Sequence, residues 1–416
     1  MIRTDLSRLF LGESSRGSIE LAMESRSECG QPEMVHKALL NWRGGCLCSA
    51  EVEHDVMSKT DLKIPKTMRA VVYRGANDLQ LEQVDVPRIG RSEILVRVDA
   101  CGVCPTDIKK IEYGLQAPPR IYGHETAGTV VKAGASVVGW KAGDRVGLHH
   151  HVPCLKCHAC RHKAFAQCPG YKRTGITAGF EPAGGGYAEY VRVMDFCLPG
   201  VVRIPRANTA VEGAMLEPVN TVLKAIKMLG LLSGDTVLVI GQGPIGLLFT
   251  RLLSLRGASV VATDLLERRL KLAKDFGAKI VGLPDAKSIL DGVDRLTQGR
   301  GVDAVVVAVP VDAAVVQGQS LLRGGGRMCL FAHTKRGATT ALDLSTICVD
   351  EKQLLGSYSS DFTLQKEVAK LVFSRKLDVR KLVTHEFPLA QTAEAIRLAS
   401  KPTPEALKVV VSHNRA

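Results

Sequence analysis

Hydrophobic and polar residues begin to alternate regularly at Met68. The segment MRAVVYRG, which starts there, has the period of a half-buried strand, and ILVRVDACGVC over residues 94–104 repeats that pattern. Residues 1–67 show no sustained apolar periodicity, and they fit neither a secretory signal nor a mitochondrial transit peptide. We therefore predict a disordered extension over residues 1–67 and a folded unit that starts at Met68.

A second pattern, over residues 236–264, joins strand and helix periods. The segment TVLVI leads into GQGPIG, a helical segment LLFTRLLSLRGA follows, and SVVATD returns to strand. Gly241, Gly243 and Gly246 form a G-x-G-x-x-G turn, which indicates a dinucleotide site when a strand and a helix flank it, as they do here. The free N–H groups at the start of the helix would face the pyrophosphate.

Asp264 ends the second strand, about twenty residues after the glycine turn. A carboxylate at this position accepts hydrogen bonds from the adenosine ribose and repels a 2′-phosphate, so the sequence favours NAD over NADP. Arg268 and Arg269 temper this preference, because a nearby arginine can accommodate the phosphate. The predicted cofactor-binding residues are Gly241, Gly243, Pro244, Ile245, Gly246, Asp264 and Arg269.

Two more strand-like segments follow, AVVVAVP over residues 304–310 and RMCLFAH over residues 327–333, each after a segment of helical pattern. Alternation of strands with helices is typical of a doubly wound parallel sheet. We therefore assign the fold class as α/β and predict a Rossmann-type dinucleotide-binding domain over residues 221–350.

Composition adds exclusions and one strong motif. The 416 residues, 45% hydrophobic and 23% charged, exclude a fibrous or disordered chain. The sequence has no run of about eighteen apolar residues, so it predicts no membrane-spanning helix.

Twelve cysteines are too few for a disulfide scaffold, but four of them have the spacing C-x2-C-x2-C-x7-C, which suits a zinc ion. Four thiolates leave no open coordination position, so this zinc is expected to be structural. The four are Cys154, Cys157, Cys160 and Cys168.

The basic residues within this motif raise a rival interpretation, a nucleic-acid zinc ribbon. Ribbons place two C-x2-C pairs about 15–20 residues apart, which is not the spacing here. The net charge of +13 permits an anionic partner without naming one.

His149, His150 and His151 precede the motif, but consecutive residues of an extended segment point to alternate faces, so we do not expect them to share a metal. Cys101, Cys197, Cys329 and Cys348 are expected to be small buried side chains.

Several motifs follow one another in a distinctive order. They are CGVCPTD from Cys101, GHETAGTV from Gly123, the four-cysteine motif, GGGYAEYV from Gly184, LEPVNT from Leu216 and VLVIGQGPIG from Val237. Together they resemble the zinc-containing medium-chain alcohol dehydrogenases, especially the sorbitol, threonine and secondary-alcohol dehydrogenase branch. The resemblance covers the chain from Met68 to its end. It implies a mainly β, GroES-like catalytic domain over residues 68–220, to which residues 351–416 return.

The resemblance also implies a catalytic zinc site with one open coordination position. Its protein ligands map to Cys104, His124 and Glu217, and Glu125 can replace one of them. Glu217 stands where another branch of the family has a cysteine. An oxygen ligand in place of a thiolate leaves more positive charge on the metal, which should make it a stronger Lewis acid.

In the family, the released proton passes through a hydroxyl that maps to Thr106, then through the cofactor ribose, then to a histidine that maps to Lys109. Lysine at that position is a departure from the family pattern. The outer end of the proton relay is therefore open: Lys109 can instead pair with the negative charge of the cofactor, and water can complete the proton transfer. Asp107 is expected either to support the metal ligands or to cap the following turn.

These features predict a zinc-dependent oxidoreductase that transfers a hydride between NAD(H) and a secondary alcohol, polyol or hydroxy-amino acid, through a zinc-bound alkoxide. We expect two zinc ions per chain, one catalytic and one structural, and NAD rather than NADP. The alternatives are a non-catalytic family member and, less favoured, a zinc-knuckle nucleic-acid binder. We further expect a small-molecule alcohol or ketone as partner, no nucleic acid or membrane, a homodimer or homotetramer, and a cytoplasmic location.

Overall fold

The computed structural model describes residues 64–173, 176–181, 184–332, 337–401 and 403–413, all of which lie in one compact unit, Asp61–Ala416. The prediction of a disordered extension over residues 1–67 therefore falls almost entirely outside the described residues. No described helix is long and apolar enough to cross a membrane.

The predicted parallel sheet is present and has six strands. Their order, β11-β10-β9-β12-β13-β14, is that of a doubly wound dinucleotide-binding sheet, which confirms the predicted fold class. All neighbouring strands run parallel. The strands are β9 (Thr236–Ile240), β10 (Ser259–Thr263), β11 (Ile280–Gly282), β12 (Val302–Val307), β13 (Leu322–Leu330) and β14 (Gln353–Gly356).

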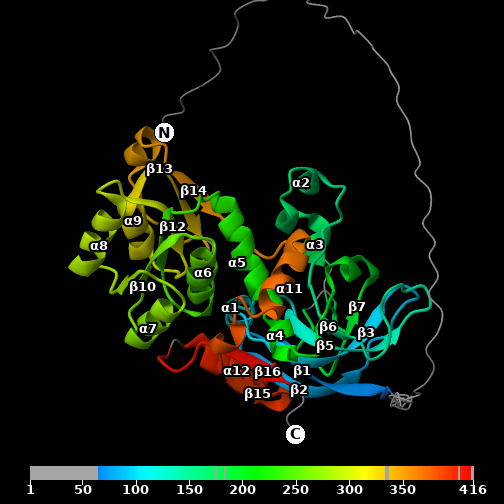
Figure 1. Ribbon diagram of the computed structural model, residues 1–416. Helices are drawn as coiled ribbons and strands as arrows, with labels where there is room; N and C mark the ends of the chain where they lie inside the picture. Colours follow the sequence, from blue (N-terminus) through cyan, green and yellow to red (C-terminus); the bar gives the residue numbers. More distant parts are fainter. Residues whose placement is uncertain (1–63, 174–175, 182–183, 333–336, 402, 414–416) are drawn as a thin grey trace, which may run out of the picture. The chain divides into compact units, whose positions relative to one another are not determined.

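Helices cover both faces of this sheet (Figure 1). Alternate side chains of β9 enter different apolar clusters: Val237 and Val239 pack with α5, α6, α7 and α11, whereas Leu238 and Ile240 pack with α8 and α9. The helices are α5 (Leu216–Leu229), α6 (Pro244–Leu255), α7 (Glu267–Asp275), α8 (Lys287–Thr297), α9 (Asp312–Leu321), α10 (Leu344–Val349) and α11 (Gln365–Phe373).

The parallel sheet extends beyond residue 350, where we expected the dinucleotide-binding domain to end. β14 pairs with β13, and Val368 and Val372 of α11 belong to the same apolar cluster as α5 and α6. Residues 353–373 therefore pack with the parallel sheet rather than with the β-rich part of the chain.

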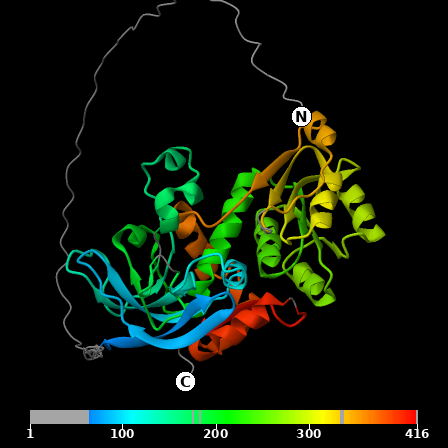
Figure 2. The same ribbon diagram turned by 180° about the vertical axis from the view of Figure 1, so that it is seen from behind.

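Antiparallel strands form the β-rich part, in two sheets. One has the order β15-β16-β3-β5-β6-β8, with β7 also paired to β3, and the other has the order β2-β1-β4. Figure 2 shows β1 and β2 as a long blue hairpin. The strands are β1 (Thr67–Gly75), β2 (Asp78–Asp85), β3 (Ile94–Gly102), β4 (Arg120–Ile121), β5 (Glu125–Ala133), β6 (Arg145–Gly147), β7 (Tyr190–Val193) and β8 (Val202–Arg203).

Residues near the C-terminus complete this β-rich part. β15 (Val383–Pro388) runs parallel to β16 (Lys408–Ser412), and β16 pairs antiparallel with β3. Helix α12 (Thr392–Ser400) lies beside both strands, in red at the lower edge of Figure 1. A lysine at the start of β16 is thereby placed next to the end of β3, where the candidate catalytic residues begin.

Candidate active site and zinc-binding clusters

The glycine turn after β9 has the geometry that a dinucleotide site requires. Gly241 has φ +91°, a left-handed conformation that favours glycine. A Cβ on Gly246 would collide with the carbonyl oxygen of Gly241, so a glycine there lets α6 start close to the strand. Pro244 is the first residue of α6, whose N-terminal N–H groups are open to an anion.

Asp264 follows β10 and is buried beside this turn. Its carboxylate accepts hydrogen bonds from the backbone N–H groups of Gln242 (2.6 Å) and Leu266 (2.9 Å). Arg269 Nη1 lies 3.9 Å from Asp264 Oδ2. The sequence had indicated Asp264 for its ribose contact alone, whereas the structure shows that it also holds the turn in place through Gln242.

The candidate catalytic cluster forms where β3 ends and β5 begins. Cys104 precedes the first residue of α1 (Pro105–Glu112), and His124 precedes β5, which Glu125 starts. The ligand atoms of Cys104, His124 and Glu125 lie within 4.8 Å of one another. Gly123 turns the chain before His124 with φ +98°, and a Cβ there would lie 2.8 Å from the sulfur of Cys101. This cluster brings together residues separated by twenty positions in sequence.

Asp107 supports His124 from inside the fold. His124 Nδ1 and Asp107 Oδ1 are 3.1 Å apart, and the hydroxyl of Tyr187 donates a hydrogen bond to Asp107 Oδ2 at 3.4 Å. Burial alone would lower the pKa of His124, but the negative charges of Asp107 and Cys104 outweigh it and hold that pKa well above its usual range. With Nδ1 held by Asp107, Nε2 is the nitrogen left to bind a metal.

Lys408 is a charged neighbour of this cluster that the sequence reasoning did not identify. It starts β16, is buried, and forms an ion pair with the Glu125 carboxylate. Lys408 Nζ also donates a hydrogen bond to the carbonyl oxygen of Val103 at 2.8 Å. Burial lowers the pKa of Lys408, but the charge of Glu125 outweighs it and raises that pKa above its usual value.

Glu217, the expected third ligand, does not join the group formed by Cys104 and His124. It lies on α5, is 5% exposed, and its Oε1 is 3.8 Å from His150 Nδ1. Burial raises the pKa of Glu217 to about 7, opposed by the nearby charge of His124. The structure therefore places Glu125, which we expected in reserve, among the clustered ligand atoms, and Glu217 beside them.

One cavity of about 630 Å³ connects the catalytic cluster with the dinucleotide turn. Its walls include Cys104, Thr106, Lys109, His124, Glu125 and Glu217, together with Gly243, Pro244, Ile245 and Arg269. Three other predicted cofactor residues, Gly241, Gly246 and Asp264, shape the turn without lining this cavity. The cavity is large enough for a small substrate and the reactive end of a cofactor.

Two of the three consecutive histidines, His150 and His151, lie at one wall of this cavity. The rings of His124 and His150 are 4.9 Å apart between centroids, and those of His150 and His151 are 4.1 Å apart. His151 stacks on Tyr171 at 4.2 Å. Burial lowers the pKa of His150 well below its usual value, and the neighbouring histidines lower it further, so its ring is neutral near pH 7. Among the described residues, the groups of possible metal ligands do not include these histidines.

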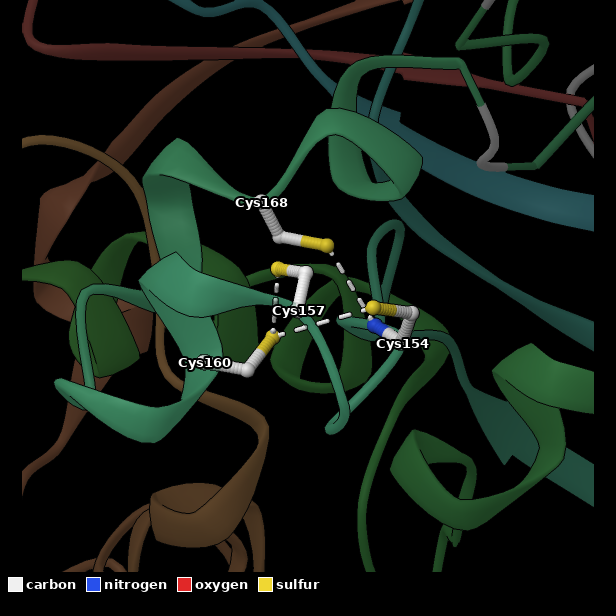
Figure 3. Close-up of side chains that lie close together, drawn as sticks. All are labelled: Cys154, Cys157, Cys160 and Cys168. Carbon is white, nitrogen blue, oxygen red and sulfur yellow. Dashed lines mark hydrogen bonds between the residues drawn. The ribbon is translucent and has the colours of Figure 1, made fainter.

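The four cysteines of the C-x2-C-x2-C-x7-C motif converge (Figure 3). The sulfurs of Cys157 and Cys160 are 3.5 Å apart and those of Cys154 and Cys160 are 4.0 Å apart, while the Cys154 N–H donates to the Cys168 sulfur at 3.4 Å. Backbone N–H groups of Lys156 and Cys157 lower the pKa of Cys154 to about 6, which favours the thiolate. This arrangement fits a closed tetrahedral zinc site.

Short helices carry this four-cysteine lobe, residues 154–173, and connect it to the cavity. They are α2 (His158–Arg161) and α3 (Pro169–Arg173). Tyr171 of α3 packs with Cys160 and Cys168 and forms a hydrogen bond with the hydroxyl of Ser359. Because Tyr171 and Ser359 both line the cavity, the lobe contributes directly to its wall.

Among the described residues, four cysteines lie outside the two clusters, and all but one of them are buried. Cys101, Cys197 and Cys329 are buried, as expected. Cys348, on α10, is exposed, so our expectation for it is wrong. No residue of α10 is buried, because this short helix packs only loosely at the edge of the fold.

Two family models match the chain, in the order of its two parts. The alcohol dehydrogenase GroES-like domain matches residues 90–205, and the zinc-binding dehydrogenase model matches residues 244–374. The second match extends past residue 350, in agreement with the position of β14 and α11 in the parallel sheet.

Curated relatives cover the same region. Sorbitol dehydrogenase of Bombyx mori is 30% identical over 354 residues, which is 82% of this chain and 97% of the relative. L-threonine 3-dehydrogenase of Bacillus velezensis is 29% identical over 343 residues, 80% of this chain and 96% of the relative. These two relatives act on different alcohols, so similarity at this level does not identify the substrate.

Solved structures share the fold. A protein assigned as a zinc-binding dehydrogenase from Sinorhizobium meliloti 1021, bound to NADP, matches with a TM-score of 0.75 at 28% identity, over 84% of this chain and 100% of its own. Acetophenone reductase from Geotrichum candidum, in complex with NAD, matches with a TM-score of 0.70 at 25% identity, over 84% of this chain and 98% of its own. With these matches, the relatives above and the geometry of both cysteine clusters, the chain belongs to the zinc-containing medium-chain alcohol dehydrogenase family.

Proposed function

We propose that the protein is a zinc-dependent oxidoreductase that transfers a hydride between NAD(H) and a secondary alcohol, polyol or hydroxy-amino acid. The observation that carries this proposal is the shared cavity, which Cys104, His124 and Glu125 line on one side and the turn at Gly243 lines on another. A metal-ligand cluster and a dinucleotide turn in one cavity suit metal-assisted hydride transfer to or from a carbon that bears oxygen. The alternatives, a non-catalytic binder and a nucleic-acid zinc knuckle, would not need this cavity.

Cys104, His124 and Glu125 would hold the catalytic zinc, with Glu217 as the alternative oxygen ligand. Sulfur, imidazole nitrogen and carboxylate oxygen are the donors that zinc takes in proteins, and three protein ligands with one open position are typical of catalytic sites. Zinc at this cluster would supply Lewis-acid chemistry, which lowers the pKa of an alcohol hydroxyl toward neutrality. Asp107 keeps His124 oriented, and Lys408 offsets the charge of Glu125.

Thr106 is the hydroxyl of this chain best placed to receive the proton of the substrate. It is the second residue of α1 and lines the cavity, two residues after Cys104. Its hydroxyl would accept that proton and pass its own outward. Lys109 lines the same wall, and burial lowers its pKa although Cys104 and Glu112 oppose that shift. Lys109 would hold the cofactor beside Thr106.

The cofactor would bind against the turn between β9 and α6, with its pyrophosphate at the N-terminus of α6. Asp264 would accept the ribose hydroxyls, which supports NAD over NADP. Arg269, which lines the cavity and lies 3.9 Å from Asp264, would contact the phosphates. The solved relatives include both an NAD complex and an NADP complex, so this preference needs its own measurement.

A second zinc would be held by Cys154, Cys157, Cys160 and Cys168 and would have a structural role, because four thiolates fill its coordination sphere. Two zinc sites built on cysteine need reduced thiols, which supports a reducing compartment such as the cytoplasm. For assembly we propose the homodimer or homotetramer that the family resemblance implies, which light scattering on the purified protein will measure.

The function is tested by combining metal analysis with a kinetic screen. Purified protein loaded with zinc should contain two zinc ions per chain by plasma mass spectrometry. It should reduce NAD, followed at 340 nm, with at least one member of a panel of secondary alcohols, alditols and β-hydroxy amino acids. A fully loaded protein that produces no NADH with any of them, in either direction, would refute the proposal.

A further inference from the structure

Helix α1 presents a cationic face to the cavity. Thr106, Lys109 and Lys110 all line the cavity, and their spacing of three and four residues places them on one side of the helix. Thr106 and Lys110 are about 6 Å apart along the helix axis, at about 1.5 Å per residue. A group bound by Lys110 would therefore lie about one helical turn from the hydroxyl that we propose receives the proton.

Two of the three acidic side chains that line the cavity are paired, and the third lies beside a neutral histidine. Asp107 pairs with His124, Glu125 pairs with Lys408, and Glu217 lies beside His150. Lys110 has no such partner: among the described residues it forms neither an ion pair nor a hydrogen bond. The positive charge of Lys110 nevertheless acts on buried groups, because it contributes to lowering the pKa values of Asp107 and His150.

The only partner that the described structure gives the Lys110 ammonium is the ring of Tyr122, whose centroid is 5.8 Å from Nζ. Tyr122 is 2% exposed and packs on Tyr73, so this platform is rigid. A cation–π contact of this kind is weak, and it leaves the three N–H donors of the ammonium available. The ring thus keeps Lys110 at the cavity without neutralising its charge.

We propose that Lys110 binds a carboxylate of the substrate, so that the preferred substrate is a polyhydroxy acid rather than a neutral polyol. This inference rests on the proposed function. A single lysine suits the single charge of a carboxylate better than a phosphate dianion, which usually recruits several cations or an arginine. A β-hydroxy amino acid fits less well, because its ammonium would need an acid of its own: Asp107 and Glu125 are paired, and Glu217 is the alternative ligand that we propose for the zinc.

The reaction balances as for any alcohol of the family. One C–H and one O–H bond of the hydroxy acid break and a C=O bond forms. NAD takes the hydride, the Thr106 hydroxyl accepts the proton and passes its own outward to water, and the carboxylate is unchanged. Lys110 is thus a residue for substrate recognition and takes no part in the bond changes.

The test compares matched pairs in which a carboxylate replaces one terminal CH2OH group: four-, five- and six-carbon alditols and the aldonates of the same configuration. For the preferred configuration, kcat/KM should be at least tenfold higher for the aldonate, mainly through a lower KM, and the advantage should shrink with added salt. Equal efficiency for alditols and aldonates would overturn the role of Lys110 and leave the proposed function standing. Activity with neither series but with a secondary alcohol or β-hydroxy amino acid would also overturn the role of Lys110, whereas activity with no member of the whole panel would overturn the proposed function itself.

Variants assign the preference to Lys110. K110Q should lower the ratio of aldonate to alditol kcat/KM at least tenfold, whereas K110R should retain most of that ratio because it keeps the charge. The control, K132Q, removes an exposed lysine of β5 and should leave the ratio unchanged. An unchanged ratio in K110Q would overturn the proposal.

A binding measurement separates substrate recognition from cofactor recognition. Titration calorimetry with NADH should give the same dissociation constant, within about twofold, for K110Q and K132Q. An NADH affinity that falls tenfold in K110Q alone would mean that Lys110 contacts the phosphates of the cofactor, and that result would also overturn the proposal.

Discussion

Replacing Asp264 by asparagine removes one negative charge beside the dinucleotide turn without changing the size of the side chain. In the structure, the Asp264 carboxylate accepts the N–H of Gln242 at 2.6 Å and lies 3.9 Å from Arg269 Nη1. We expect D264N to bind NADH more weakly and NADPH more tightly. The reason is twofold: the carboxylate that repels a 2′-phosphate is lost, and Arg269 is released to pair with that phosphate.

The size of the effect follows from the charges. Two unit charges about 5 Å apart, at an effective dielectric constant of about 20, repel each other by about 3 kcal/mol. At about 1.4 kcal/mol for each factor of ten, the ratio of NADPH to NADH affinity should rise about 100-fold. Asparagine also points an NH2 group at one of the two backbone N–H donors, so the free energy of unfolding should fall by about 1–3 kcal/mol.

Calorimetric titration with NADH and NADPH measures this ratio without any knowledge of the substrate. Urea unfolding, monitored in parallel, shows how much of any loss in affinity comes from the turn itself. The matched control is D291N, which removes an exposed acid of α8 and should change neither quantity. A ratio that stays within about threefold of the wild-type value in D264N would refute the assignment of Asp264 to the ribose.

The remaining predictions concern both metal sites and one buried network. C104S should lose one of two zinc ions, measured by mass spectrometry, while the melting temperature changes little, because the four-cysteine lobe keeps its own ion. Y171F removes the hydrogen bond to Ser359 and should raise KM for the substrate about fivefold, equivalent to about 1 kcal/mol, with little change in kcat. E212Q should lower the free energy of unfolding at pH 7 by about 2 kcal/mol, because the buried Glu212 carboxylate accepts a hydrogen bond from Arg375 at 3.0 Å.

The Glu212 prediction has a defined pH dependence. Burial would raise the pKa of Glu212, but hydrogen bonds from Arg375, from the Thr209 N–H and from Asn208 outweigh it, so that pKa lies below its usual value. The stabilisation is therefore complete above the unfolded-state pKa, about 4.3, and is lost as the pH falls through the lower folded-state pKa. Wild type and E212Q should converge in stability at acidic pH; a difference that grows on acidification would contradict this sign.

Contradicting outcomes for the other two variants are equally specific. Loss of both zinc ions in C104S would show that the clusters are coupled or wrongly assigned. A Y171F enzyme that loses kcat and keeps KM would place Tyr171 in the chemistry rather than at the cavity wall.

Local patterns in the sequence were sufficient for the parallel sheet and for the glycine turn. The strand TVLVI, the turn at Gly241 and the helix after Pro244 are consecutive, so their periods and glycines specify them without reference to the rest of the chain. The four cysteines are also close in sequence, and their spacing alone predicts their convergence in space. Family resemblance, rather than local pattern, indicated Cys104 and His124.

Features that depend on distant packing could not be predicted in this way. Lys408 reaches Glu125 only because β16 pairs with β3, a contact across about three hundred residues. Tertiary packing likewise brings Glu125, which we expected in reserve, among the clustered ligand atoms in place of Glu217, the expected ligand. The parallel sheet also extends past residue 350 because β14 pairs with β13, and a single sequence does not reveal such strand pairing.

Because Tyr171 lines the cavity, the shape of the substrate space can change without a change in the catalytic cluster or the dinucleotide turn. Tyr171 follows Cys168 by three residues and reaches both His151 and Ser359. A substitution within the four-cysteine lobe can therefore reshape the space available to an alcohol while Cys104 and the dinucleotide turn stay as they are. In evolution, substitutions in the lobe could therefore change the range of accepted alcohols while the reaction itself stays the same.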